Sequence, residues 1–508
     1  MRRTLALITA IMILALFSGA PAGAQETRGG QTLRALLVSC DDFVSQADTG
    51  SAARTNVKLI RQTLEADRRG YAAIREESGT LSTVDAFRSA VEQTFAQAAE
   101  GDISVFYIST HGLYNVSRSN LTAALLLSDG TNEEQLDVLT MEEIFSHIKG
   151  IKVLILDACN AGAFIGKGLS DPAERAAFTG PDYKVLCSAG GSEESWYWRS
   201  KNSDRTEQRG ASYFASIFSN GLSAGDGYPA DDNRDGKITL AEAYQYVLGN
   251  YAASTPQVYP QEDGSFSLFE YDAAVKPEPT DALTDISFDD TVLTGPLSQV
   301  SFSFTVRREI KVIYQLVYFQ NGVWRFQDAQ VIKDETDGET LLAGRKNRSL
   351  TLALSDEDVE TSGYIMLQIF SREADNKLWL QGSKLLCVQP VEGDLVMEVK
   401  TGQAFSPAAG QEMGVRVLHD TPCSLTVSVQ NMQGETVDYL GYDQPTRPQH
   451  LVPEGSCLYW DGTLADGSLA PAGSYIIKAR TNIGGKTYIA YSSPFMLLDR
   501  DGRAPAEG

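Results

Sequence analysis

Two short segments of this 508-residue chain end an apolar run in residues that can do chemistry. The run FYISTHG, residues 106–112, ends in a histidine, His111, and VLILDACNAG, residues 153–162, carries a cysteine, Cys159. A cysteine becomes a strong nucleophile when a nearby imidazole takes its proton or balances its charge. The two segments therefore predict thiol chemistry, with Cys159 as nucleophile and His111 as general base.

Each of these residues has a plainer interpretation when it is taken alone. A lone cysteine at the end of a strand is usually a small core residue, and a lone histidine there is often a satisfied core residue. The pair is more specific, because the chain has only four histidines and two of them, His419 and His450, lie far towards the C-terminus. The remaining one, His147, is expected on the polar face of a helix.

The surrounding segments predict the sheet that positions this pair. Near-continuous apolar runs indicate buried strands at 34–40, 103–109, 151–156 and 183–188, and helical periodicity indicates helices at 52–66, 84–99, 141–148 and 213–222. Strands that alternate with helices predict an α/β fold, with a mostly parallel sheet covered by helices on both faces. Such sheets place their functional sites at the carboxyl edge, where the polar residues after each strand meet.

The two motifs, strand–(S/T)-x-H-G and strand–D-x-C-x-x-G, resemble those of caspase-like peptidases, in particular the bacterial metacaspase type. The resemblance covers about residues 32–270, and the histidine lies about 50 residues upstream of the cysteine, as in caspases. It implies a Cys–His dyad, with the backbone N–H groups of Gly112 and Cys159 as the oxyanion hole. Many metacaspases have His-Ser after the cysteine, where this chain has Asn160 and Ala161, so clostripain-like and legumain-like peptidases remain alternatives.

The same resemblance implies a substrate preference. In metacaspases the residue two positions before the cysteine, here Asp157, lines the pocket for the substrate residue that precedes the cut. A negative charge in this pocket favours a cationic side chain, so we predict protein or peptide substrates cleaved after Arg or Lys. Asp41 and Asp42, which follow the first strand, are expected to add charge to the same pocket. The alternative is that Asp157 only caps the turn after its strand.

A peptidase with this preference has basic residues of its own that it could cut. The polar segment 191–210 is expected to be an exposed loop, and exposed loops are readily nicked. Its basic residues are Arg199, Lys201, Arg205 and Arg209, and Lys167 and Arg175 are further candidates. The alternative is a solvated loop that is never processed.

Residues 231–242, DDNRDGKITLAE, match the EF-hand calcium loop in full. The expected ligands are the side-chain oxygens of Asp231, Asn233, Asp235 and Glu242 and the backbone carbonyl of Lys237. We therefore predict a structural Ca²⁺ site in the same domain. The alternative is an acidic, Asx-rich turn that needs no metal.

The N-terminus has the pattern of a secretory signal peptide, residues 1–24. Arg2 and Arg3 precede an apolar run from Leu5 to Phe17, and small residues follow before Gln25. The alternative is an uncleaved membrane anchor, for which the run is short. The formal net charge of −23 argues against nucleic acid or an anionic membrane as the main partner. These features predict an exported protein, periplasmic or extracellular, with no membrane span after cleavage.

The C-terminal half changes character after a proline-containing linker near residues 273–282. Short alternating strands predict two all-β sandwich domains, at 283–390 and 395–498. The pattern W-D-G…D-G…P-A-G-x-Y within residues 455–480 resembles the Ig-like domain of flagellar hook-capping proteins, with Trp460 and Tyr475 expected in the core. Such modules imply either a cell-surface or extracellular partner or a spacer. A catalytically inactive caspase-like protein with Ig-like adhesion modules, used for binding or assembly, is thus the competing interpretation.

Cys423 and Cys457, both within the last of these predicted domains, are candidates for a disulfide.

Overall fold

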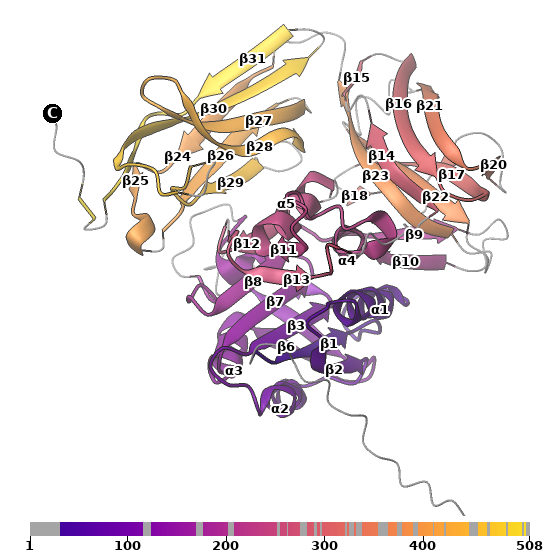
Figure 1. Cartoon of the computed structure of the whole chain (residues 1–508), viewed down its shortest axis with the longest axis vertical. Coiled ribbons are helices and arrows are strands. Elements are labelled where there is room, and N and C mark those ends of the chain that lie inside the picture. The colour runs from indigo at the N-terminus through magenta and orange to yellow at the C-terminus, as the bar shows by residue number, and fades with distance from the viewer. Residues whose placement is uncertain are drawn as a thin grey trace, which may run out of the picture.

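The computed structural model of the chain has three parts, which Figure 1 shows as an α/β body and two all-β lobes. The α/β body spans residues 33–270, the middle lobe 283–389 and the last lobe 397–497. The predicted signal peptide, residues 1–24, lies outside the described residues. The structure describes residues 31–503 with gaps at 115–122, 169–175, 202–207, 251–253, 262, 275–281, 289–291, 295–296, 321–322, 325–329, 332–337, 354–363, 373–377, 390–394, 410, 421–422, 447–455, 465–467, 484–485 and 500–501.

A six-stranded sheet forms the centre of the α/β body. Its strands are β1 (Leu33–Ser39), β2 (Tyr71–Ser78), β3 (Ile103–Ser109), β7 (Ile151–Asp157), β8 (Tyr183–Cys187) and β12 (Gln257–Tyr259). Their order is β12-β8-β7-β3-β1-β2, and all neighbours are parallel except β12, which pairs antiparallel with β8. Successive side chains of β1 enter two separate cores, Leu37 on one face and Leu36 on the other. Because both faces are buried, these strands are apolar throughout rather than alternating.

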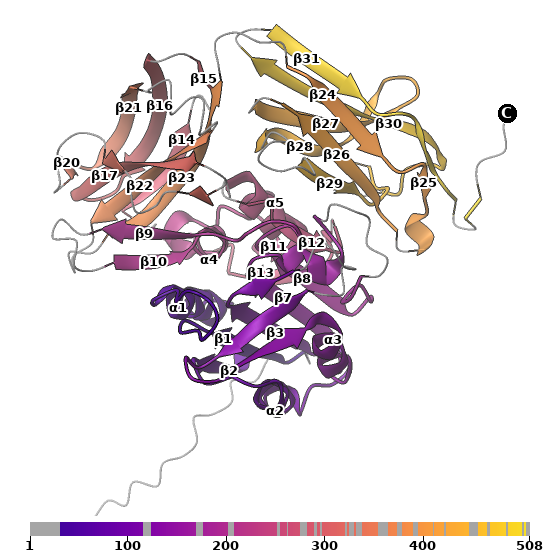
Figure 2. The same cartoon turned by 180° about the vertical axis from the view of Figure 1, so that it is seen from behind.

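Helices cover both faces of the sheet, as the sequence predicts (Figure 2). One face packs against α1 (Ala52–Glu65), α4 (Tyr213–Gly221) and α5 (Leu240–Asn250), and the other against α2 (Val84–Phe95) and α3 (Val138–Ser146). Three helices begin at a side chain that accepts a backbone N–H of the first turn, namely Thr83, Asp137 and Ser212. Such caps satisfy N–H groups that have no partner within the helix.

Several strands of the α/β body were not expected from the sequence. The edge strand β2 has the sequence YAAIREES, in which charged and half-buried residues hide the strand pattern. A small sheet is formed by β4 (Gly112–Leu113), β5 (Ala124–Ser128) and β6 (Glu133–Asp137). The expected loop at 191–210 instead contains a hairpin of β9 (Tyr197–Lys201) and β10 (Gln208–Ser212). Two of the suggested self-cleavage sites, Arg175 and Arg205, lie outside the described residues.

The middle lobe consists of two sheets around one core. The smaller sheet has β14 (Leu283–Phe288), β16 (Leu297–Val306) and β21 (Gly344–Ala353). The larger has β15 (Val292–Thr294), β17 (Ile310–Gln320), β18 (Val323–Trp324), β19 (Gln330–Val331), β20 (Glu339–Leu341), β22 (Tyr364–Arg372) and β23 (Leu378–Gln389). Phe302 from the smaller sheet meets Tyr314 from the larger one edge-on, with ring centroids 5.4 Å apart.

The last lobe also has two sheets. One contains β24 (Met397–Thr401), β26 (Met413–His419) and β29 (Ser456–Trp460). The other contains β25 (Ala404–Phe405), β27 (Cys423–Asn431), β28 (Thr436–Thr446), β30 (Gly473–Ile483), β31 (Lys486–Tyr491) and β32 (Phe495–Leu497). Trp460 and Tyr475 are buried in its core with ring centroids 5.0 Å apart, as expected. Cys423 is a free, buried thiol, and the side chain of its suggested partner Cys457 lies outside the described ones.

The middle lobe packs directly onto the β9–β10 hairpin. The buried indole of Trp198 lies 5.9 Å from the Phe370 ring and 6.2 Å from the Trp379 ring, centroid to centroid. Gln368 of β22 also donates a hydrogen bond to the hydroxyl of Tyr213 at the start of α4. One apolar core therefore continues from the α/β body into the middle lobe.

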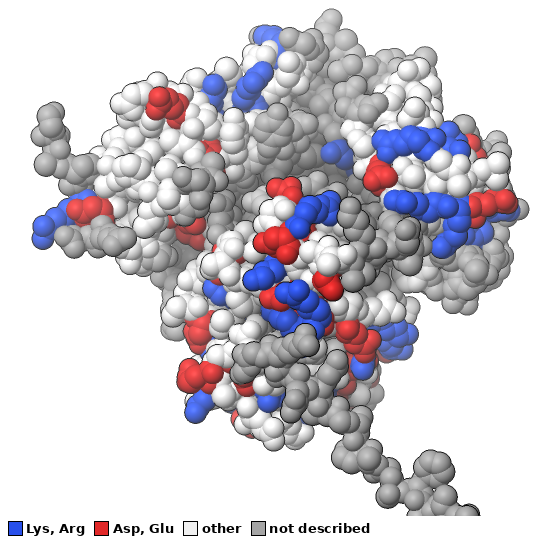
Figure 3. Space-filling model, in the orientation of Figure 1, with Lys and Arg blue, Asp and Glu red and all other residues white. Residues whose placement is uncertain are grey.

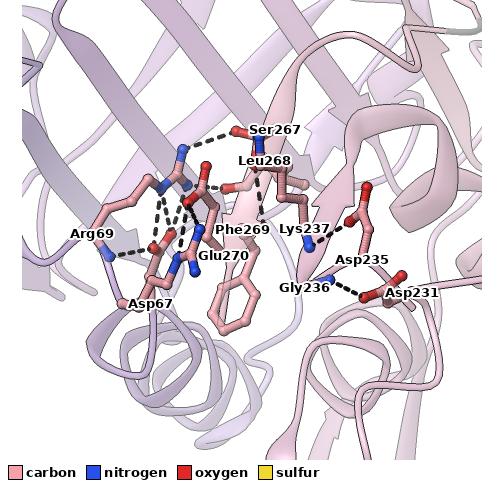
Figure 4. A network of polar contacts seen from close by, with 11 residues as sticks. Asp67, Arg69, Asp231, Asp235, Gly236, Lys237, Ser267, Leu268, Phe269 and Glu270 are labelled. Carbon is pink, nitrogen blue, oxygen red and sulfur yellow. Dashed lines mark hydrogen bonds and ion pairs between the residues drawn. The ribbon is translucent and has the colours of Figure 1, made fainter. Parts of the chain in front are cut away.

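A polar network joins the turn after α1 to the strand that pairs with the predicted calcium loop (Figure 4). Arg69, after α1, forms a bidentate pair with the buried Asp67 and donates to the carbonyls of Ser267 (2.9 Å) and Leu268 (2.6 Å). These carbonyls belong to β13 (Ser267–Glu270), which pairs with β11 (Lys237–Thr239). The network thereby ties the turn after α1 to the predicted calcium loop.

The charges on the surface of the α/β body are mixed in sign. Figure 3 shows acidic and basic side chains interspersed on the visible face. The net charge is therefore not concentrated in one acidic patch on this face. Among the described helices, none has the length and apolar character needed to cross a bilayer.

Gly112 marks the point where the chain after β3 meets the chain after β7. A Cβ atom added at Gly112 would lie 1.7 Å from the carbonyl oxygen of Cys159 and 2.7 Å from its carbonyl carbon. The His111 carbonyl accepts the N–H of Leu126 at 2.9 Å, which holds this backbone in place. Only glycine permits so close an approach of two backbones.

We expect Gly112→Ala to lower the free energy of unfolding by about 1–3 kcal/mol, because the added methyl group overpacks a fixed contact. Urea unfolding measures this change. The matched control is Gly249→Ala in α5, where an added Cβ meets nothing within 4 Å. The control should be neutral or stabilising by up to about 1 kcal/mol, because alanine favours the helix. Equal stability of the two variants would contradict the packing argument.

Candidate active site

The register of the central sheet brings His111 and Cys159 to the same edge. In the parallel pair of β3 and β7, Ser109 lies opposite Asp157. His111 and Cys159 each follow two residues later, so both emerge at the carboxyl edge. They line one cleft, together with Thr49, Ala52, Ala53, Asn56, Ser109, Thr110, Asp157, Ala158, Ser195, Trp196, Tyr197 and Ser212.

The imidazole of His111 is oriented by the loop after β1. Its Nε2 atom lies 2.8 Å from the carbonyl oxygen of Ala47, and the Phe43 ring packs edge-on with its centroid 4.5 Å away. A carbonyl oxygen only accepts hydrogen bonds, so Nε2 carries a proton in this arrangement. In the neutral ring Nδ1 is then the nitrogen that can accept a proton from a thiol.

Carboxylates fix the shape of that loop. Glu133 of β6 accepts the N–H of Val44 at 2.9 Å and the hydroxyl of Ser45. The buried Asp41 accepts the hydroxyl of Thr49 at 2.8 Å and the N–H of Ala53 at 2.9 Å. Burial raises the pKa of Asp41 above its ordinary value.

The expected contribution of Asp41 and Asp42 to the substrate pocket is corrected by this geometry. Neither residue is among those that line the cleft. The Asp41 carboxylate instead satisfies N–H groups at the start of α1, which have no partner within the helix. Asp41 thus shapes the loop that holds His111, and its side chain is not part of the cleft lining.

Cys159 is held by the backbone of a distant segment. Its thiol lies 3.7 Å from the carbonyl oxygen of Ser195, and the N–H of Ser195 lies 3.4 Å from Sγ. Burial raises the pKa of Cys159 to about 11. The resting thiol is therefore protonated, and it needs a base to become a nucleophile.

Asp157 lies in the cleft next to the cysteine and is almost fully buried. Its carboxylate accepts hydrogen bonds from Tyr107 (2.8 Å), Ser195 (3.4 Å), Asn56 (3.5 Å) and the hydroxyl of Ser212. Burial raises the pKa of Asp157 to about 6, against the opposing effect of these hydrogen bonds. Within the described part of the chain, the groups hydrogen-bonded to Asp157 are neutral, so none of them balances its charge.

The turn after the nucleophile explains the residue at position 160. Asn160 has a left-handed backbone, with φ of 58°, which a short polar side chain tolerates better than most. Its N–H donates to the Glu193 carbonyl at 2.7 Å, and its side chain donates to the Gly191 carbonyl at 3.0 Å. Asn160 therefore ties the cysteine to the segment that contains Ser195. The oxyanion role of Gly112 and Cys159 stays a prediction.

Several cleft residues carry no signal in the sequence. Asn56 lies within α1, Ser195 to Tyr197 in a polar segment and Ser212 at the start of α4, far from either motif. No local pattern distinguishes these residues from surface polar residues. Only the folding of α1 and α4 onto one face of the sheet brings them to Asp157.

The predicted calcium loop is held by its own hydrogen bonds (Figure 4). The buried Asp231 accepts the N–H groups of Arg234 (2.7 Å) and Gly236 (3.0 Å) and the hydroxyl of Tyr271 (2.7 Å). The side chains of Asn233, Asp235 and Glu242 accept the N–H groups of Asp235, Lys237 and Thr239, respectively. Across the described ranges, no three His, Cys, Asp or Glu side chains gather as a metal site. Calcium binding stays a prediction.

Comparisons with known proteins agree with this arrangement in its coarse features. Residues 5–179 match the family model of the CHAT domain, a stretch that contains both His111 and Cys159. A search of curated proteins finds no match.

Two solved structures are each similar over less than half of this chain. A protein of Geobacter sulfurreducens has 13% identity and a TM-score of 0.30, covering 45% of this chain and 92% of its own. Caspase-1 of Spodoptera frugiperda has 12% identity and a TM-score of 0.28, covering 46% of this chain and 88% of its own. The family match, together with the sheet order and the shared cleft of His111 and Cys159, supports a caspase-like fold for the α/β body.

Proposed function

We propose that this protein is a cysteine endopeptidase of caspase or metacaspase type. The observation that carries the proposal is the cleft that His111 and Cys159 line together, with Nε2 of His111 bonded to the Ala47 carbonyl. This orientation leaves Nδ1 as the proton acceptor of the dyad. The CHAT match includes both residues and supports the same class of chemistry.

The proposed reaction follows from these positions. Nδ1 of His111 takes the thiol proton, and Sγ of Cys159 attacks the scissile carbonyl carbon to form a C–S bond. The backbone N–H groups of Gly112 and Cys159 stabilise the negative charge on the carbonyl oxygen. His111 returns the proton to the leaving amine as the C–N bond breaks. Water, activated by the same imidazole, then hydrolyses the thioester and restores the thiol.

The substrate residue before the cut is proposed to be Arg or Lys. Asp157 provides a buried carboxylate in the cleft, and its hydrogen-bond partners within the described residues are neutral. A substrate cation would supply the missing opposite charge in a place shielded from water, where ion pairs are stronger than at the surface. A substrate aspartate would instead meet like charge.

The signal-peptide pattern and the two β lobes support an exported enzyme with a cell-surface or extracellular partner. One observation favours the rival function, an inactive binding or assembly protein. The thiol of Cys159 is hydrogen-bonded to the backbone of Ser195, and burial raises its pKa to about 11. An enzyme must release this thiol to the imidazole, whereas a binding protein has no need to.

Hydrolysis of reporter peptides separates the two functions. We expect the wild type to cleave peptides ending in Arg or Lys and Cys159→Ala to lose at least roughly 10³-fold in kcat, as other nucleophile deletions do.

Asp157→Asn keeps the shape of the side chain but removes its charge, and should lower kcat/KM for Arg peptides by about 30-fold, or roughly 2 kcal/mol. Preference for Asp before the cut would sink the specificity argument. No turnover with any peptide would favour the binding protein.

The pH dependence of the reaction should report Asp157. Because burial raises its pKa to about 6, the carboxyl is neutral below this pH and charged above it. We expect kcat/KM for an Arg peptide to rise with pH through a pKa near 6. In Asp157→Asn this step should disappear, while any step that belongs to the dyad should persist. An unchanged profile in the variant would show that Asp157 does not govern substrate binding.

Calcium binding by residues 231–242 is proposed on the strength of the sequence match alone. Calorimetric titration of the purified chain with Ca²⁺ should show binding at millimolar concentration or tighter. Asp235→Asn and Glu242→Gln should weaken it, because both remove charge from predicted ligands. Absence of heat at millimolar Ca²⁺ would leave the Asx-rich turn as the whole account of this loop.

A further inference from the structure

Lys167 lies in an unusual place for a lysine. It follows the short helix η2 (Ala161–Ile165), which comes directly after the nucleophile turn, and only 4% of its surface is exposed. Its ammonium group contacts the carbonyl of Val258 (2.8 Å), the side-chain oxygen of Gln261 (2.8 Å), the carboxylate of Glu412 (2.5 Å) and the Tyr459 ring (4.9 Å to the centroid). Two of these partners belong to the α/β body and two to the last lobe.

The partners in the last lobe lie on adjacent strands. Glu412 directly precedes β26, and Tyr459 is in β29, where it lies opposite Gly414 of β26. The Tyr459 hydroxyl also accepts the N–H of Gly168 at 2.7 Å. One corner of the last lobe therefore holds both the side chain of Lys167 and the backbone that follows it.

The held segment is continuous with the nucleophile. We define the nucleophile loop as residues 159–168. The Lys167 N–H donates to the Gly162 carbonyl at 2.9 Å, which closes the loop on itself. An added Cβ at Gly168 would lie 2.5 Å from the Cα of Gly190, so the loop presses directly on the neighbouring chain.

The neighbouring chain is the segment that holds the thiol. Gly191 donates its N–H to the Lys167 carbonyl at 2.9 Å, and Ser192 donates to the Gly168 carbonyl at 2.8 Å. A few residues further on, the N–H and carbonyl of Ser195 contact Sγ of Cys159. Side-chain contacts thus join the last lobe to the nucleophile loop. Backbone hydrogen bonds join this loop to the segment whose Ser195 contacts the thiol.

We propose that the last lobe positions Cys159 by holding the nucleophile loop through Lys167 and Gly168. This inference rests on the proposed peptidase function and adds a role for the lobe. A buried ion pair gains little net stability over well-packed apolar residues, but it admits few alternative arrangements. Lys167 and Glu412 are therefore suited to fixing the geometry of the loop. Lys167, Glu412 and Tyr459 act as positioning residues.

The same contacts correct an expectation about self-cleavage. Lys167 is one of the suggested sites, but its side chain is buried under the last lobe. A protease needs an exposed, extended segment, so the bond after Lys167 is protected while the lobe is docked. Release of the lobe would remove the part of this cover that Glu412 and Tyr459 supply.

The test is the double variant Glu412→Gln, Tyr459→Phe, which leaves the α/β body unchanged. Three readouts are used: kcat and KM for Arg peptides, the rate of Cys159 alkylation by iodoacetamide, and trypsin cleavage after Lys167, the last two by mass spectrometry. We expect kcat to fall about tenfold or more with KM little changed, because small displacements of a catalytic group are costly. Alkylation should become severalfold faster, and trypsin should cut after Lys167.

The control is Glu398→Gln in the same lobe, whose carboxylate pairs with Lys400 at the surface.

Alkylation and trypsin cleavage do not depend on turnover. They therefore test whether the last lobe holds the nucleophile loop even if the wild type hydrolyses no peptide. Unchanged alkylation, unchanged trypsin resistance and unchanged kcat in the double variant would overturn the proposal. If the double variant fails to fold by circular dichroism, Tyr459→Phe alone keeps the ring and removes the acceptor for the Gly168 N–H. The single variant should then show the same three changes to a smaller degree, and wild-type values would overturn the proposal equally.

Discussion

The parallel pairing of β3 with β7 is the constraint on which the candidate site depends. It sets Ser109 opposite Asp157 and so delivers His111 and Cys159, from two separate motifs, to one cleft. A slip of one residue in this register would turn every following side chain to the other face. The near-continuous apolar sequence of both strands does not by itself specify the register. The contact between Gly112 and the Cys159 carbonyl helps to do so, because it admits only one alignment of the two strand ends.

Asp157 shows how the cleft combines stability with a capacity to bind. A buried carboxylate is costly unless hydrogen bonds compensate it, and here four neutral donors from β3, α1 and the region around α4 do so. Even with these hydrogen bonds the pKa of Asp157 is about 6, so the carboxyl changes its charge close to neutral pH. The alternative for Asp157 was that it only caps the turn after β7, but its hydrogen bonds are not to that turn. Its partners come from across the cleft rather than from the adjacent turn.

The sequence predicts the central sheet well because its strands are apolar on both faces. The bounds of β3 agree in full with the expectation, and those of β1, β7 and β8 agree within a residue. It fails for β2 and for the β9–β10 hairpin, whose strands contain charged and polar residues and lie at edges or under another lobe. It singles out His111, Cys159 and Asp157 because they lie at the ends of apolar strands, and all three line the cleft. Sequence does not show that the start of α1 binds the Asp41 carboxylate. It also does not find Ser195 or Asn56, whose role depends on tertiary contacts.

The packing of Trp198 has a consequence for what counts as a domain in this chain. The apolar core around α4 and the β9–β10 hairpin includes Met366, Phe370 and Leu378 from the middle lobe. The boundary near residue 271, where the composition changes, is therefore a boundary in sequence but not in the core. A fragment that ended there would present indole and aliphatic surface to water, as an interface without its partner does. We therefore expect the α/β body and the middle lobe to unfold together, because they share this core.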